Sequence, residues 1–107
     1  MQNINANELA GWLDDESRVS PLLLDVREPW EYQLCHIEGS RTMPMNTVPA
    51  NVEQLEKDTP IVCICHHGMR SMQVARFLEQ QGFTDVINLT GGVDAWAAQV
   101  DRDMPTY

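Results

Sequence analysis

The sequence lacks any long apolar run and contains few basic residues. Of its 107 residues, 7 are Lys or Arg and 16 are Asp or Glu, which gives a net charge of −9 at pH 7. Such a charge disfavours attraction to the phosphate backbone of nucleic acids and to anionic membrane surfaces. No segment approaches the roughly 20 apolar residues that a membrane-spanning helix requires. We therefore expect neither a nucleic-acid partner nor a membrane partner.

Residues 1–5 contain neither a basic region nor an apolar stretch, so we expect no export signal there. The chain has 3 cysteines. An odd number at irregular spacing fits free thiols in a reducing compartment better than a disulfide framework. The sequence therefore predicts a cytoplasmic protein in which at least one thiol is available for chemistry.

Internal repeats, low-complexity tracts and linkers rich in Gly, Ser or Pro are also missing from the sequence. A chain of this length can bury one packed core but is too short for two ordinary domains. We therefore expect residues 1–107 to form a single domain.

Short apolar runs alternate with segments of helical periodicity. The apolar runs at residues 22–26, 61–64 and 85–89 suit strands covered on both faces, and a shorter strand is predicted around residues 40–43. Helices are predicted from an Asn5-x-x-Glu8 capping box onward and at residues 51–55, 71–81 and 93–98. The alternation predicts an α/β layer structure with a mostly parallel sheet. Ligands of such sheets bind beyond the carboxyl ends of the strands, which directs attention to the residues after Ile64.

The loop that follows Ile64 reads Cys65-His66-His67-Gly68-Met69-Arg70-Ser71 and leads into a predicted helix. A thiol there faces the positive end of the helix dipole and loop N–H groups without strand partners, and both favour the thiolate. Gly68 permits a positive φ, which lets successive N–H groups turn inward and form a cradle for an anion. Arg70 adds a positive charge. Cys65 is therefore expected to be ionised at neutral pH and to act as a nucleophile.

The pattern C-x-x-G-x-R-S, here Cys65 to Ser71, resembles the active-site loop of rhodanese domains. Residues 25–32 and 36–40 are similar to the upstream signature of that family, and residues 82–83 with 89–96 are similar to its C-terminal signature. Three motifs in the expected order carry more weight than one short loop would. The resemblance covers nearly the whole chain.

This resemblance implies a three-layer fold around a central, mostly parallel sheet of about five strands. It also implies transfer of a sulfane sulfur from a small anionic donor, such as thiosulfate, to an acceptor that is cyanide, a thiol or a protein. Cys65 would carry the sulfur as a persulfide. The N–H groups of the loop would stabilise negative charge, with Arg70 binding the sulfonate end of the donor; these substrate-binding residues are His66, His67, Gly68, Met69, Arg70 and Ser71. No metal and no organic cofactor are implied.

Two other functions are compatible with parts of this pattern. Cysteine-dependent phosphatases and arsenate reductases also close a cysteine loop with an arginine, but their pattern places five residues between the two. Here four residues separate Cys65 from Arg70, and the smaller cradle suits sulfur better than a tetrahedral phosphate. Rhodanese-like domains that lack the cysteine act as interaction modules, and the presence of Cys65 argues against that role.

The remaining cysteines and histidines are assigned mostly structural roles. Cys63 is expected to be a buried, inert thiol, and Cys35, in a polar turn, an incidental exposed thiol. Zinc binding by the cysteines and histidines around Cys65 receives little weight, because the paired spacings of a structural site are missing. His66 and His67 are candidate proton donors, although loop histidines more often matter through their backbone.

Several other side chains are expected to be structural. The family pattern suggests a structural hydrogen bond for His36. Asp25 and Arg27 are expected to pair, either to orient the active-site loop or to close a buried ion pair in the core, and the structural role is preferred. Core packing is predicted for all three tryptophans, Trp12, Trp30 and Trp96.

Overall fold

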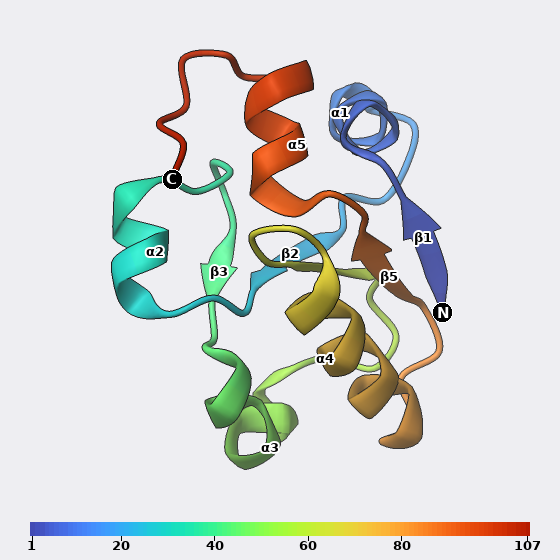
Figure 1. Ribbon diagram of the computed structural model, residues 1–107. Coiled ribbons are helices and arrows are strands. Elements are labelled where there is room, and N and C mark those ends of the chain that lie inside the picture. Colours follow the sequence, from blue (N-terminus) through green and yellow to red (C-terminus); the bar gives the residue numbers. More distant parts are fainter.

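The computed structural model describes the whole chain, Met1–Tyr107, and its centre is a sheet of five parallel strands in the order β1-β5-β4-β2-β3 (Figure 1). The strands are β1 (Gln2–Ile4), β2 (Leu22–Asp25), β3 (Arg41–Thr42), β4 (Ile61–Ile64) and β5 (Val86–Leu89). The helices are α1 (Ala6–Asp14), α2 (Pro29–Leu34), α3 (Val48–Asn51), α4 (Met69–Gln80) and α5 (Gly92–Gln99), with 3₁₀ turns at Met45–Thr47 and Val52–Gln54. The predicted α/β class is confirmed.

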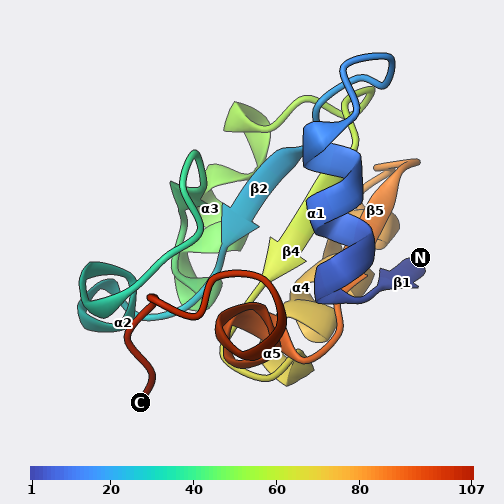
Figure 2. The same cartoon turned by 90° about the horizontal axis from the view of Figure 1, so that it is seen from above.

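Helices cover both faces of the sheet, so the fold has three layers (Figures 1 and 2). Helices α1 and α5 lie on one face, and α3 and α4 lie on the other. The three central strands, β2, β4 and β5, contribute to both cores because successive side chains point to opposite faces. In β4, for example, Val62 and Ile64 pack in the core under α1 and α5, whereas Ile61 and Cys63 pack in the core under α3 and α4. All four β4 residues are buried, which explains the uninterrupted apolar run.

Local sequence signals account for several element boundaries. The capping box before α1 is present, with Glu8 N–H donating to Asn5 Oδ1 at 2.8 Å and Asn5 N–H donating to Glu8 Oε1 at 3.0 Å. Helix α4 begins two residues earlier than predicted, since Gly68, with φ of 105°, ends the preceding loop. The helix predicted at residues 51–55 is wrong in its position: α3 starts at Val48 and residues 52–54 form a 3₁₀ turn.

Two elements were not predicted from the sequence. Strand β1 lies at the edge of the sheet and is too short, at three residues, to show a pattern. Helix α2 buries only Glu31 and therefore has no apolar periodicity, although Pro29 in its first turn favours helix initiation.

Burial of the three tryptophans and of two cysteines confirms some of the expectations and corrects others. Trp12 and Trp96 are buried as predicted, but Trp30 is 61% exposed on α2, so its predicted core position is wrong. Cys35, expected to be exposed, is buried, because the chain turns inward after α2 and packs it in the core under α5. Cys63 is fully buried, and this burial raises the pKa of its thiol to about 12.

The register of the central strands determines where the candidate site lies. Asp25, the last residue of β2, pairs with Ile64, the last residue of β4, and Val26 N–H donates to the Ile64 carbonyl at 2.9 Å. The segments that follow β2 and β4 therefore leave the sheet side by side at its carboxyl edge. No helix in the fold is both long enough and apolar enough to cross a bilayer.

Candidate active site

The cysteine loop lies at the carboxyl edge of the sheet, between β4 and α4. Gly68 adopts the positive φ that was predicted for it, and its backbone packs tightly against the turn after β5. A Cβ atom at Gly68 would lie 3.3 Å from both Gly91 N and the Leu89 carbonyl oxygen. The glycine is therefore required for its conformation and for its close approach to the neighbouring turn.

Cys65 occupies the centre of this loop and is almost completely buried. Its Sγ accepts the N–H of Gly68 at 3.0 Å and lies 3.3 Å from Ser71 Oγ. Ser71 Oγ in turn donates to Asn88 Oδ1 at 2.5 Å. The single hydroxyl proton of Ser71 is directed to Asn88, so in this arrangement the Cys65 thiol donates to Ser71 Oγ. The Gly68 N–H is the contact that favours negative charge on the sulfur.

Asn88 of β5 connects the cysteine loop to the sheet through side-chain hydrogen bonds, and sequence reasoning missed it. It is buried, and its Nδ2 donates to the Gly68 carbonyl at 3.2 Å while its Oδ1 accepts from Ser71. A single amide inside the apolar run of β5 was the available signal, because buried polar side chains require partners.

The start of α5 holds the backbone of the cysteine loop. Val93 N–H donates to the Cys65 carbonyl at 2.9 Å, and Asp94 N–H donates to the His66 carbonyl at 3.1 Å. The loop approaches Gly92 so closely that a Cβ there would lie 2.2 Å from the Cys65 oxygen. Because the C=O and N–H of one trans peptide point in opposite directions, these contacts turn the N–H groups of His66 and His67 away from α5.

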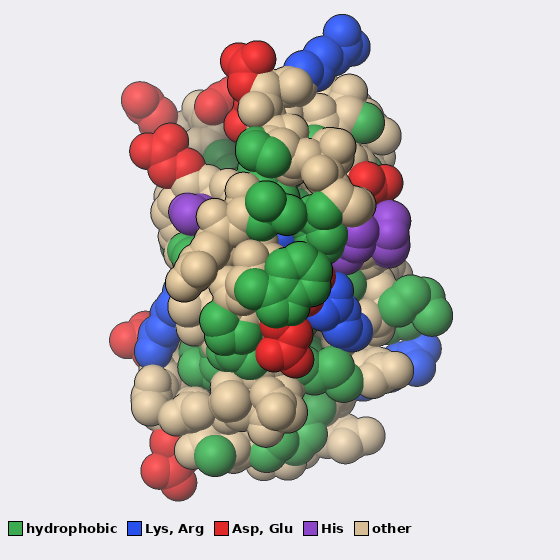
Figure 3. Space-filling model, turned by 60° about the vertical axis from the view of Figure 1, so that its left-hand side comes forward, with side chains coloured by type: hydrophobic (Ala, Val, Ile, Leu, Met, Phe, Trp, Pro, Cys, Tyr) green, Lys and Arg blue, Asp and Glu red, His purple; other side chains and the backbone are tan.

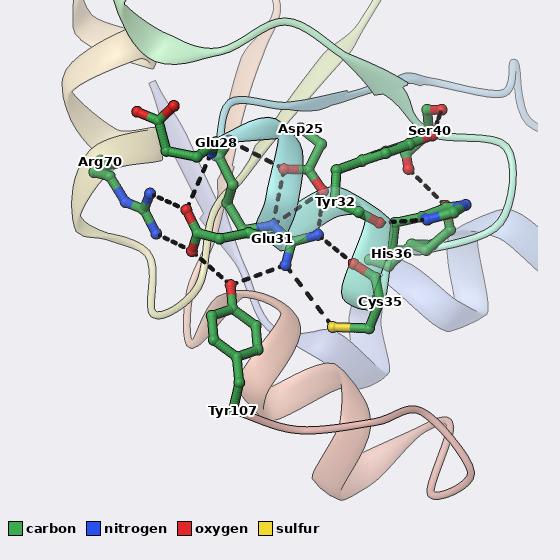
Figure 4. Close-up of polar contacts among 11 residues, drawn as sticks. Asp25, Glu28, Glu31, Tyr32, Cys35, His36, Ser40, Arg70 and Tyr107 are labelled. Atoms are coloured by element: carbon green, nitrogen blue, oxygen red, sulfur yellow. Dashed lines mark hydrogen bonds and ion pairs between the residues drawn. The ribbon is translucent and has the colours of Figure 1, made fainter.

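Arg70 does not project freely from the loop, because it forms an ion pair with Glu31 of α2. Its Nη1 and Nη2 donate to the two carboxylate oxygens of Glu31 at 2.7 and 2.9 Å, in a fork that matches the carboxylate (Figure 4). The hydrogen bonds from Arg70 lower the pKa of Glu31 to about 2, and the same contacts raise the pKa of Arg70 above its ordinary value. Sequence reasoning gave Arg70 the correct charge and missed this partner.

Tyr107 extends the polar cluster to the segment that follows α5. Its hydroxyl donates to Glu31 Oε2 at 2.7 Å and accepts from Arg27 Nη1 at 2.9 Å (Figure 4). Arg27 also forms the predicted ion pair with Asp25, at 2.7 Å, and both side chains are buried. Burial alone would lower the pKa of Arg27, but its hydrogen bonds to Asp25 and Tyr107 raise it above the ordinary value.

The side chains of the loop histidines lie in different surroundings. The His66 ring stacks on Tyr107, with centroids 3.9 Å apart, and its Nε2 is buried without a hydrogen-bond partner. Burial, assisted by the neighbouring His67, lowers the pKa of His66. His67 is exposed, with Nδ1 3.8 Å from Asp94 Oδ2. A neutral His66 at pH 7 follows from its surroundings.

The other predicted residues lie near the site or outside it. Met69 is 71% exposed and points away from the core. His36 Nδ1 lies 2.8 Å from the Tyr32 carbonyl oxygen, the structural contact expected for it. No three side chains among His, Cys, Asp and Glu converge to hold a metal ion.

The surface beside the site is partly apolar. Figure 3 shows a band of hydrophobic side chains next to histidine, basic and acidic groups on this side of the molecule. The exposed large hydrophobic side chains of α2 and of the segment after α5 are Trp30, Leu34, Val100 and Tyr107. Trp30 and Tyr107 contact one another edge to face, with centroids 5.8 Å apart.

Comparisons with known proteins agree with this site. The family profile described as Rhodanese-like domain matches residues 5–99. Thiosulfate sulfurtransferase GlpE of Pseudomonas paraeruginosa is 37% identical over 84 residues, which are 78% of this chain and 76% of that protein. A rhodanese-like domain protein of Staphylococcus aureus, solved by crystallography, superposes with a TM-score of 0.84 at 31% identity, covering 100% of this chain and 99% of that one.

Longer proteins also contain a similar segment. The probable adenylyltransferase/sulfurtransferase MoeZ of Mycobacterium tuberculosis is 34% identical over 106 residues. The match covers 97% of this chain and 26% of that protein, so the chain spans about a quarter of the length of this relative.

Proposed function

The chain belongs to the rhodanese-like domain family, and from that premise we propose that it is a sulfurtransferase that carries sulfane sulfur as a persulfide on Cys65. The observation that carries the proposal is the contact of Cys65 Sγ with the Gly68 N–H at 3.0 Å, at the start of a helix and at the carboxyl edge of the sheet. We further propose that residues 1–107 act as one domain in the cytoplasm, without a metal or an organic cofactor.

The first half-reaction loads sulfur onto the enzyme. The Cys65 thiolate attacks the outer sulfur of thiosulfate or a similar donor, an S–S bond forms, and the donor S–S bond breaks. For thiosulfate, sulfite leaves with the bonding electron pair. The persulfide that remains, Cys65–S–S⁻, bears its negative charge on the outer sulfur, where loop N–H groups are available to stabilise it.

The second half-reaction unloads the sulfur. A nucleophilic acceptor, such as cyanide, a thiol or a protein thiol, attacks the outer sulfur, and the bond to Cys65 breaks. The electron pair of that bond returns to Cys65 as thiolate, so no external oxidant or reductant is needed. The Ser71 hydroxyl lies between Sγ and Asn88, and it can donate to the thiolate by turning its single proton from Asn88 Oδ1 to the sulfur.

Arg70 is proposed to attract the anionic end of the donor. Two of its five N–H donors are committed to Glu31, so the remaining donors are available to a sulfonate oxygen without loss of the ion pair. Because the Glu31 carboxylate offsets the positive charge of Arg70, the selection of the sulfur donor should depend on hydrogen-bond geometry more than on long-range attraction.

Intact-mass measurement after incubation with thiosulfate tests the proposal. Wild-type protein should gain one sulfur atom, and cyanide should remove it with formation of thiocyanate. Cys65→Ser should gain none, whereas Cys63→Ser, which changes a buried thiol outside the loop, should load normally. Undiminished loading of Cys65→Ser would refute the assignment.

A parallel assay separates this function from phosphatase chemistry. Hydrolysis of an activated aryl phosphate by the wild-type protein should be negligible beside its thiosulfate:cyanide activity, because four residues rather than five lie between Cys65 and Arg70. Faster turnover of the aryl phosphate than of thiosulfate would favour the phosphatase instead.

A further inference from the structure

We propose that Tyr107 is a positioning residue of the cysteine loop, which it holds at His66 by ring stacking and at Arg70 through Glu31. The inference rests on the proposed function for one of its readouts, and the others are independent of sulfur transfer. Tyr107 lies far from the loop in the sequence, and Figure 4 shows its hydroxyl directed into the polar cluster between α2 and the loop.

The hydroxyl of Tyr107 has only one arrangement that satisfies both of its partners. Arg27 Nη1 can only donate a hydrogen bond, so the phenolic oxygen accepts from it and the phenolic proton is directed to Glu31. Burial and the carboxylate beside it raise the pKa of Tyr107 to about 12, so the proton stays in place at neutral pH. The orientation of this hydrogen bond is thereby fixed.

Glu31 transmits this constraint to Arg70. Its Oε2 accepts from both Tyr107 and Arg70 Nη2, and its Oε1 accepts from Arg70 Nη1 and from the backbone N–H of Glu28. Four donors therefore hold a carboxylate that is almost completely buried. Without Tyr107, Glu31 Oε2 would accept a hydrogen bond from Arg70 alone. The Glu31–Arg70 ion pair would then lose its hydrogen bond to the segment after α5.

The ring of Tyr107 supplies the second constraint. It lies nearly parallel to the His66 ring, at an interplanar angle of 9° and a centroid distance of 3.9 Å. The rings of Trp30 and Tyr107 meet at an interplanar angle of 69°, and Met104, buried in the core, anchors the segment that carries Tyr107. His66 directly follows Cys65, and its carbonyl is held by Asp94 N–H, so the ring and the backbone of His66 are both fixed.

The two constraints act on residues that lie before and after Gly68 in the loop. His66 precedes Gly68 and Arg70 follows it, and the Gly68 N–H is the backbone donor to Cys65 Sγ. Catalytic groups need to be held within roughly 0.5 Å of their productive positions, and a loop end left free does not meet that requirement. Tyr107 thus positions the cradle without touching the sulfur.

Three variants separate the two constraints. Tyr107→Phe keeps the ring and loses the hydroxyl, whereas Tyr107→Leu loses both. Tyr32→Phe is the matched control, because Tyr32 donates a hydrogen bond of the same length, 2.7 Å, to the Ser40 carbonyl and lies outside the loop contacts. Each variant should first be verified as folded by circular dichroism.

Nuclear magnetic resonance gives two readouts that do not depend on activity. In Tyr107→Leu, the pKa of His66 should rise toward its ordinary value, because the ring that buries it is gone. The other charged and titratable groups that act on His66 are His67, Asp94, Glu31 and Arg70, and none of them is substituted in this variant. Hydrogen exchange of the Gly68 amide should accelerate by about tenfold or more, as expected for a loop that opens more often. Tyr32→Phe should match wild type in both measurements.

Steady-state kinetics gives the third readout. Tyr107→Phe should raise KM for thiosulfate by about threefold to tenfold with little change in kcat, as expected when only the Glu31–Arg70 arm loosens. Tyr107→Leu should also lower kcat. Wild-type values of KM, kcat and Gly68 exchange in both Tyr107 variants would overturn the proposal.

The outcomes also distinguish this proposal from the proposed function. If wild-type protein takes up no sulfur, the sulfurtransferase assignment fails, and the His66 titration and the Gly68 exchange still decide the role of Tyr107. If Tyr107→Leu does not fold, the KM of Tyr107→Phe for thiosulfate decides the role of Tyr107. If the wild-type protein is also inactive, hydrogen exchange of the Gly68 amide in Tyr107→Phe decides it. A Tyr107→Phe protein that equals Tyr32→Phe in that measurement would then contradict a positioning role.

Discussion

Replacing Glu31 with glutamine should remove a contribution to stability that depends on pH. The carboxylate has an ordinary pKa of 4.5, and the hydrogen bonds from Arg70 lower the pKa of Glu31 in the folded protein to about 2. At 1.36 kcal/mol per pKa unit, this difference corresponds to about 3 kcal/mol of stability. Since the Arg70 side chain is 37% exposed and solvent screens it, we expect about 2 kcal/mol.

The sign follows from the lowered pKa. A carboxyl group whose pKa is lower in the folded protein contributes its full stabilisation above the unfolded pKa of 4.5, and the stabilisation is lost as the pH falls toward 2. The amide side chain of the Glu31→Gln variant does not titrate. The difference in unfolding free energy between wild type and Glu31→Gln should therefore be about 2 kcal/mol near pH 6 and should fall to less than half of that near pH 3.

Urea unfolding followed by tryptophan fluorescence measures this difference, since Trp12 and Trp96 are buried. Glu38→Gln serves as the control, because Glu38 is exposed and its side chain makes no hydrogen bond or ion pair. All other carboxylates titrate alike in the three proteins, so their contributions cancel. A difference between wild type and Glu31→Gln that stays constant from about pH 6 to about pH 3 would refute the assigned ion pair.

The buried cysteines, the close approach at Gly92 and the charge of Arg70 can each be tested by substitution. In the folded Cys65→Ser variant, the two remaining thiols should resist iodoacetamide near pH 8, because Cys35 and Cys63 are both buried and the pKa of Cys63 is about 12. Mass spectrometry should detect labels on both cysteines only after unfolding. Gly92→Ala should lower the unfolding free energy by about 2 kcal/mol or more and slow sulfur transfer, because its Cβ would meet the Cys65 carbonyl, whereas Gly11→Ala, in open space on α1, should raise stability by about 0.5–1 kcal/mol. Arg70→Ala should lower kcat/KM for thiosulfate by about tenfold or more, mainly through KM, and an unchanged ratio would exclude Arg70 from donor binding.

The parts of the fold that the sequence predicted are those governed by local patterns. Strands β2, β4 and β5 are runs of buried apolar residues, and the Asn5 cap and Gly68 have conformational requirements that only a few residue types satisfy. Helix α2 shows no such pattern, because its buried residue is Glu31 and its tryptophan is exposed. Its place in the fold depends on contacts with distant residues.

The same division applies to the candidate site. Cys65, Gly68 and Arg70 lie within one short segment, where spacing alone brings them together. The partners of that segment are Glu31, Asn88 and Tyr107, which come from three other parts of the chain and meet the loop only after the sheet has assembled. No local signal distinguishes Tyr107 from any other tyrosine near the end of a sequence.

The contact between the Gly91-Gly92 turn and the cysteine loop also limits how such a loop can be transplanted or altered in evolution. The first N–H groups of α5 are already bonded to the carbonyls of Cys65 and His66, and the turn leaves no space for a side chain at Gly92. A loop of another length would present its carbonyls elsewhere and would leave those N–H groups without partners. The two segments should therefore be inherited, exchanged and redesigned as one unit, although an α-helix and a β-strand separate them along the chain.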